Sequence, residues 1–137
     1  MTNRPVLAVP MGDPAGIGPE ITLKALAHAI HHKKAHIVVV ADRAVMETAA
    51  RDCAVGPVFT AVVESDDACS QAIADGHESI LYHLPLVDIS QFAYGEISGM
   101  CGKAAYDAIV EAVRITLDGI ADAIVTPPLH KEALRAA

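Results

Sequence analysis

Short apolar runs alternate with segments of helical periodicity along the 137-residue chain, and this alternation limits the folds that the chain can adopt. The runs that predict strands are 5–11, 36–41, 56–63, 79–87 and 122–127. The segments that predict helices are 19–32, 43–53, 98–119 and 130–137, while 64–76 is expected to be a loop or a short helix. This order favours an α/β fold, with a mostly parallel sheet, flanking helices and right-handed crossovers.

Capping residues support the expected helix ends. Pro19 suits the first turn of its helix, and Asp42 is placed to cap the helix that follows it. Ser98 is a suitable N-cap for the long helical segment, and Gly119 is a suitable residue to end it. The stretch "DISQFAYGEISG" has the least periodicity and is expected to be a surface loop.

Composition excludes some classes of function. The formal net charge is −7 and the basic residues cluster only in "HHKK", so the basic stripe needed for nucleic-acid binding is lacking. No apolar run reaches the roughly 18 residues of a membrane span, and the N-terminus does not resemble a signal peptide. The three cysteines are odd in number and unpatterned, which indicates a reducing, cytoplasmic location. We therefore expect a small-molecule ligand.

The stretch "VPMGDPAGIGPEI" places three glycines between an expected strand and an expected helix. Gly12, Gly16 and Gly18 permit positive φ angles and close approach of a ligand to the backbone, and a helix N-terminus attracts anions. Their spacing matches neither common nucleotide-binding fingerprint, and the acidic side chains of Asp13 and Glu20 oppose an anion. From the residues alone, a tight structural turn and a ligand-facing loop are equally supported.

A second loop, "VTPPLHKEAL", also follows an expected strand and precedes an expected helix. One interpretation is a proline-rich turn in which His130 and Lys131 are solvated. The other is a substrate-facing loop in which the Lys131 ammonium meets a carboxylate or phosphate, with Thr126 nearby. Because ligands bind at the carboxyl ends of parallel strands, we expect the two loops to face one crevice.

The motifs "MGDPAGIGPEI" and "DAIVTPPLHKEAL", with "GEISGMCGKAAYDAI" between them, resemble the 4-hydroxythreonine-4-phosphate dehydrogenase family of pyridoxal phosphate biosynthesis. The resemblance covers essentially the whole chain. It implies a fold like that of isocitrate and isopropylmalate dehydrogenases, built as a two-domain homodimer. It also implies NAD- or NADP-dependent oxidation of a secondary alcohol to a β-keto acid that loses carbon dioxide, with a divalent metal polarising the oxygen.

The chain departs from the family pattern at its end. Ala137 falls within an expected helix, before the family's Gly-His-Thr substrate motif and its three metal-binding histidines. The resemblance therefore implies that residues 1–137 are the N-terminal α/β portion of a longer two-domain dehydrogenase, incomplete at the C-terminus and with no internal boundary. Metal ligands are expected beyond residue 137, and no residue of this chain is assigned to the metal.

The resemblance assigns provisional roles to residues of both loops. The residues expected at the cofactor are Gly12, Asp13, Gly16 and Gly18. The residues expected at the substrate are Thr126, His130 and Lys131, of which Lys131 is also the expected catalytic residue.

The expected reaction is oxidation and decarboxylation of 4-phosphohydroxy-L-threonine by the full-length protein, the 137-residue segment being inactive alone. One alternative keeps the chemistry and changes the substrate to another four-carbon acid sugar phosphate, erythronate or threonate 4-phosphate. Another alternative is a non-catalytic half-fold that binds a small ligand. The sequence does not decide between NAD and NADP.

Overall fold

The computed structural model describes residues 4–28, 34–129 and 131–137. Within these residues, five strands form one sheet in the order β3-β4-β2-β1-β5. The strands are β1 (Val6–Pro10), β2 (His36–Ala41), β3 (Ala61–Val63), β4 (Ser79–His83) and β5 (Ala123–Ile124). The helices are α1 (Gly18–Leu26), α3 (Arg43–Asp52), α4 (Asp66–Ala74), α5 (Gly99–Leu117) and α6 (Lys131–Ala136), with a 3₁₀ turn at Ile89–Gln91.

All four strand pairings in the sheet are parallel, which confirms the predicted fold class. The central strand β2 is buried at every position, because helices cover both faces of the sheet. β3 has only three residues, whereas the sequence predicts a strand over 56–63. Residues 64–76, for which a loop or a short helix was expected, contain the nine-residue helix α4.

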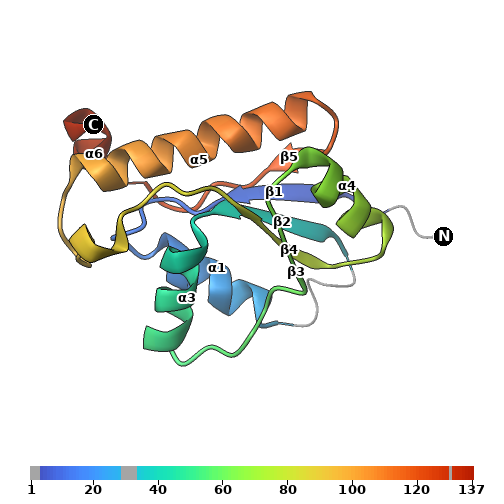
Figure 1. The fold of residues 1–137 in the computed structure, drawn as a ribbon, viewed down its shortest axis with the longest axis horizontal. Coiled ribbons are helices and arrows are strands. Elements are labelled where there is room, and N and C mark those ends of the chain that lie inside the picture. The colour runs from blue at the N-terminus through green and yellow to red at the C-terminus, as the bar shows by residue number, and fades with distance from the viewer. Residues whose placement is uncertain (1–3, 29–33, 130) are drawn as a thin grey trace.

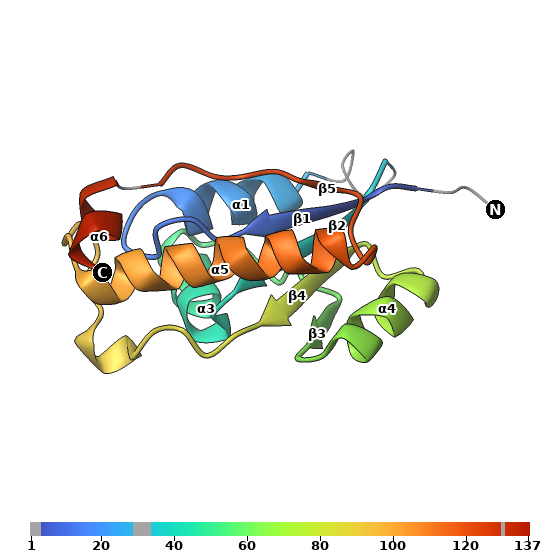
Figure 2. The same ribbon diagram turned by 90° about the horizontal axis from the view of Figure 1, so that it is seen from above.

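The helices form a layer on each face of the sheet (Figures 1 and 2). The long helix α5 crosses one face and contacts β1, β2 and β5, while α1 and α3 pack together on the other face. The Arg114 guanidinium on α5 donates to the Asp66 carboxylate at the start of α4, at 2.7 and 2.8 Å, and so ties these two helices together. Residues fully buried between the layers include Val38, Val39, Val40, Met46, Ile80, Ala108, Ala112 and Ile115.

The expected caps of α5 are confirmed. The Ser98 hydroxyl accepts a hydrogen bond from the Cys101 N–H at 3.1 Å, and Gly119 adopts a φ of 84° directly after the C-cap residue. The α1 helix is shorter than the predicted 19–32, because it ends at Leu26. Its buried residues are Gly18, Pro19, Thr22, Leu23 and Leu26, whereas Ile21 is exposed.

Parallel strands place their following loops at one edge of the sheet. The loops after β1, β2, β4 and β5 all leave from this carboxyl edge, and α5 starts there (Figure 2). In the part of the chain that is described, no helix is both long enough and apolar enough to cross a membrane.

Candidate functional site at the carboxyl edge of the sheet

The glycine loop between β1 and α1 is held by its own acidic residue. The Asp13 side chain is 6% exposed, and its Oδ1 accepts a hydrogen bond from the Ala15 N–H at 2.9 Å. The Asp13 carbonyl accepts a second hydrogen bond, from the Gly16 N–H at 3.0 Å. Gly12 adopts a φ of 75°, which favours glycine. Asp13 therefore shapes the loop from within, whereas the sequence predicts a cofactor contact for it.

Gly12 and Gly18 both lie where an added side chain would meet backbone atoms, and both lie beside the second loop. A Cβ atom at Gly12 would lie 2.9 Å from the Pro128 carbonyl oxygen and 3.3 Å from the Pro127 Cβ. A Cβ atom at Gly18 would lie 2.5 Å from the Met11 carbonyl oxygen and 3.4 Å from the Pro127 Cβ. The glycine loop and the loop after β5 thus form one continuous rim, as the sequence analysis expects.

Two of the predicted substrate residues, Thr126 and Lys131, are described and lie on the surface. Thr126 is exposed and lines a groove of about 350 Å³ between α1 and the β1–β5 edge of the sheet. Lys131 is exposed at the first residue of α6. His130 lies outside the described residues, so its contact with the substrate stays a prediction.

Gly16 differs from the other loop glycines because it is exposed at the tip of the loop. A pocket of about 210 Å³ opens beside it and is lined on one side by the carboxyl side chains of Glu20 and Asp52. The Lys24 ammonium, 2.6 Å from the Glu20 carboxylate, lowers the pKa of that carboxyl. The exposed backbone at Gly16 leaves room for a ligand, and the Glu20 carboxylate beside it is already paired with Lys24.

Asp42 connects the ends of β2 and β4 to the rim. Besides capping α3, it accepts hydrogen bonds at Oδ2 from the Leu86 N–H at 2.8 Å and the Val87 N–H at 2.9 Å. The segment that it holds then reaches the glycine loop, where the Gly95 N–H donates to the Ala15 carbonyl at 2.9 Å. Sequence reasoning found only the cap, because the partners of Oδ2 lie more than 40 residues away along the chain.

The first turn of α5 also belongs to this edge, and sequence reasoning missed it. A Cβ atom at Gly99 would lie 2.6 Å from the Ala136 carbonyl oxygen, and one at Gly102 would overlap the Ala133 carbonyl. These contacts place α6 directly on the start of α5. The available signal was the pair of glycines three residues apart, just after the N-cap Ser98.

Two of the described histidines make structural hydrogen bonds in or beside the sheet. The His36 Nδ1 lies 2.7 Å from the His77 carbonyl oxygen, and the His83 Nδ1 accepts from the Arg43 N–H at 3.0 Å. Residues 4–28, 34–129 and 131–137 contain no cluster of three His, Cys, Asp or Glu side chains that could hold a metal ion. The described residues thus supply no metal site of their own, and the metal that the resemblance implies would need ligands from elsewhere.

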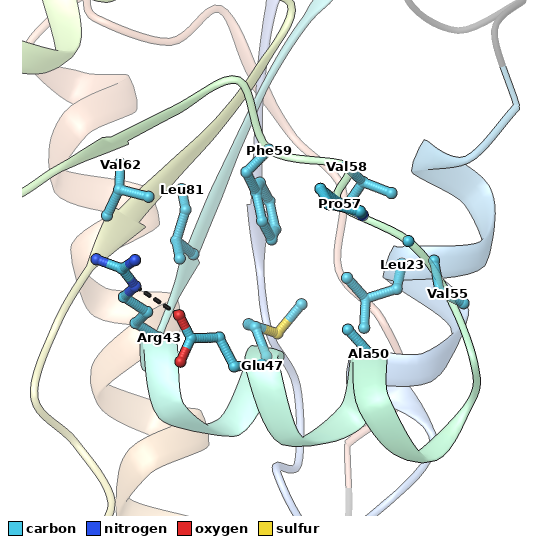
Figure 3. Close-up of a pocket in the computed structure, with 12 residues that line it drawn as sticks. Leu23, Arg43, Glu47, Ala50, Val55, Pro57, Val58, Phe59, Val62 and Leu81 are labelled. Atoms are coloured by element: carbon cyan, nitrogen blue, oxygen red, sulfur yellow. Dashed lines mark hydrogen bonds and ion pairs between the residues drawn. The ribbon is translucent and has the colours of Figure 1, made fainter.

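Another pocket, of about 370 Å³, lies elsewhere, between α3 and the β3–β4 side of the sheet (Figure 3). Mostly apolar side chains surround it, including Leu23, Phe59 and Leu81. Its two charged lining residues, Arg43 and Glu47, pair with each other at 2.7 Å. Since its charged groups are paired and the rest of its lining is mostly apolar, the rim is the stronger candidate site.

Comparison with known proteins identifies the family. A family model described as pyridoxal phosphate biosynthetic protein PdxA matches residues 33–137. The chain belongs to the PdxA family. This finding confirms the resemblance on which the sequence-based site assignment depends.

Relatives across the PdxA family match nearly the whole chain. A Clostridium botulinum protein named "Putative D-threonate 4-phosphate dehydrogenase" is 33% identical over 98% of this chain, and a Fusobacterium nucleatum protein of the same name is 36% identical over 97%. The crystal structure of a 4-hydroxythreonine-4-phosphate dehydrogenase from Burkholderia phymatum superimposes on 98% of the chain with a TM-score of 0.83 and 33% identity. The chain spans 39% of the length of each of these three proteins.

Proposed function

We propose that the protein containing this chain is an NAD- or NADP-dependent dehydrogenase that oxidises and decarboxylates 4-phosphohydroxy-L-threonine. The observation that supports this most directly is the rim, where the glycine loop packs on the loop that leads to Lys131. Membership of the PdxA family and the name of the Burkholderia phymatum structure support the same reaction. Because the chain spans only 39% of that structure, the proposal concerns the whole protein.

A second candidate keeps the chemistry and changes the substrate to D-threonate 4-phosphate. It is favoured by the names of the relatives from Clostridium botulinum and Fusobacterium nucleatum, which are 33% and 36% identical to this chain. Both candidates are four-carbon hydroxy acids that carry a phosphate. They therefore present the same kinds of anionic group to the rim.

In this proposal, the residues of the rim bind and orient, and the bound nicotinamide accepts the hydride. Gly16 forms part of the wall beside the nicotinamide half of the cofactor, since its exposed backbone admits close approach. Gly12, Asp13 and Gly18 maintain the shape of that wall. The Lys131 ammonium binds an anionic group or the reacting oxygen of the substrate, and Thr126 shapes the adjoining surface.

The remaining parts of the proposal concern the assembled protein. We propose a cytoplasmic homodimer, and a divalent metal whose ligands come from outside residues 1–137. We also propose that the 137-residue segment alone does not turn over substrate. The cytoplasmic location follows from the unpatterned cysteines, and the other parts derive from the family resemblance.

The test is an assay of cofactor reduction by the whole protein with 4-phosphohydroxy-L-threonine and D-threonate 4-phosphate, each with NAD and with NADP. The Lys131→Ala variant is expected to lower kcat/KM by roughly 10- to 100-fold, the usual effect of losing one charged hydrogen bond. Lys103→Ala is a matched control, because Lys103 is an exposed lysine that pairs only with Asp107 on the surface of α5. If Lys131→Ala stays within threefold of wild type, Lys131 has no direct role.

A further inference from the structure

Lys131 lies between two backbone contacts that both depend on glycine. On its N-terminal side, Pro127 and Pro128 pack against Gly12 and Gly18 of the glycine loop. On its C-terminal side, α6 rests on the first turn of α5. Packing on both sides of Lys131 in the chain therefore sets the position of its backbone.

The contact between α5 and α6 tolerates no side chain at Gly102. An added Cβ would overlap the carbonyl oxygen, carbonyl carbon and following nitrogen of α6 around Ala133, all of them backbone atoms. Ala133 itself is 1% exposed, so α6 cannot yield without losing its buried contact. Any residue larger than glycine must therefore push α6 away from α5.

We propose that Gly102, assisted by Gly99, is a positioning residue for Lys131. The inference rests on the proposed role of Lys131 at the substrate. The Ala133 carbonyl lies two residues after Lys131, so displacement of α6 displaces the start of the same helix. Gly99 contributes to the same contact, since the nearest atoms to its added Cβ are backbone atoms of Ala136 and Ala137.

The first test measures docking of α6 without reference to activity. Trypsin cleaves after lysine and arginine, and α6 contains Lys131 and Arg135. In Gly102→Ala, cleavage at these two residues is expected to be about tenfold faster, because a detached helix is open to the protease. Cleavage at Arg114, farther along α5, is expected to be unchanged. The control is Gly56→Ala, since no atom lies within 4 Å of a Cβ at Gly56.

The second test is a double-mutant cycle on kcat/KM in the whole protein. Gly102→Ala is expected to lower kcat/KM by about tenfold or more, since a displacement near 1 Å at a binding group costs up to about 100-fold. If Gly102 acts through Lys131, the double variant Gly102→Ala/Lys131→Ala is no slower than Lys131→Ala alone. A purely structural defect would instead add to the loss.

The outcomes separate this inference from the proposed function. Unchanged trypsin cleavage of α6 in Gly102→Ala, equal acceleration at Arg114, or additive losses in the cycle would overturn the positioning role while the dehydrogenase proposal stands. Full kcat/KM in Lys131→Ala would overturn both the role of Lys131 and this inference. Absence of cofactor reduction by the wild-type protein with either substrate would overturn the proposed function and, with it, the role of Gly102 in it.

Discussion

The Asp42 carboxylate is the best place to test how the carboxyl edge is held together. It is 4% exposed and accepts three backbone hydrogen bonds, from Ala44 at 2.9 Å, Leu86 at 2.8 Å and Val87 at 2.9 Å. The first bond caps α3, and the other two fix the start of the segment that reaches the glycine loop. Asp42→Ala removes all three acceptor contacts at once.

The loss can be worked out bond by bond. Removing an N-cap costs about 1 kcal/mol. Each of the other two N–H groups loses a charged acceptor, at roughly 1–3 kcal/mol for a buried donor left unpaired. Because these N–H groups are only partly buried, water can replace part of the lost hydrogen bonding. The cost per N–H group therefore lies at the lower end of this range, about 1 kcal/mol. We expect Asp42→Ala to lower the free energy of unfolding by about 3 kcal/mol in total.

The assay is urea denaturation followed by circular dichroism, with the free energy of unfolding taken from the transition. Asp88→Ala is the matched control, since Asp88 also caps a short turn but accepts only from Ser90, at an exposed position. The control is expected to lose less than about 1 kcal/mol. A loss below 1 kcal/mol in Asp42→Ala would refute the reasoning, because the three bonds would then contribute no more than one exposed cap.

Three further predictions concern other parts of the fold. Gly18→Ala is expected to lower the melting temperature by several degrees, because the new Cβ meets the Met11 carbonyl oxygen at 2.5 Å; an unchanged melting temperature would show that the loop is not closely packed. The Arg114 guanidinium lowers the pKa of the Asp66 carboxyl to about 2, so the stability from this pair is present above about pH 4 and lost as the pH falls toward 2. The two side chains are each 38% exposed, so Asp66→Asn should remove less than about 1 kcal/mol of acid-dependent stability, as measured by urea denaturation between pH 2 and 6. Burial raises the pKa of the half-buried Cys53 thiol, so a thiol reagent should modify Cys53 slowly in the native protein, with a rate that rises with pH, and should reach the other two cysteines only after unfolding.

Much of the fold was predictable because burial and capping leave local signals. The apolar run at 36–41 became the central strand with its bounds unchanged, and the caps Ser98 and Gly119 marked the ends of α5. The short edge strand β3 was predicted too long, because apolar residues before Ala61 pack beside a pocket without entering the sheet. The helix α1 was also predicted too long, since 19–32 was expected and it ends at Leu26.

The site was predictable only in part. Parallel strand order was enough to bring the loops after β1 and β5 to the same edge, and their motifs supplied the family. Contacts that join distant segments left no local signal, as with the Asp42 carboxylate and Leu86, or Gly102 and Ala133. The sequence also left the direction of the Asp13 carboxylate open. In the structure, it accepts a hydrogen bond from the Ala15 N–H within its own loop.

The packing of Gly12 and Gly18 against Pro127 and Pro128 has a consequence for motion. Atoms in such close contact cannot slide past one another, so the two loops must travel together as a single body. If a cleft opens and shuts around a substrate, the bending point cannot fall between them.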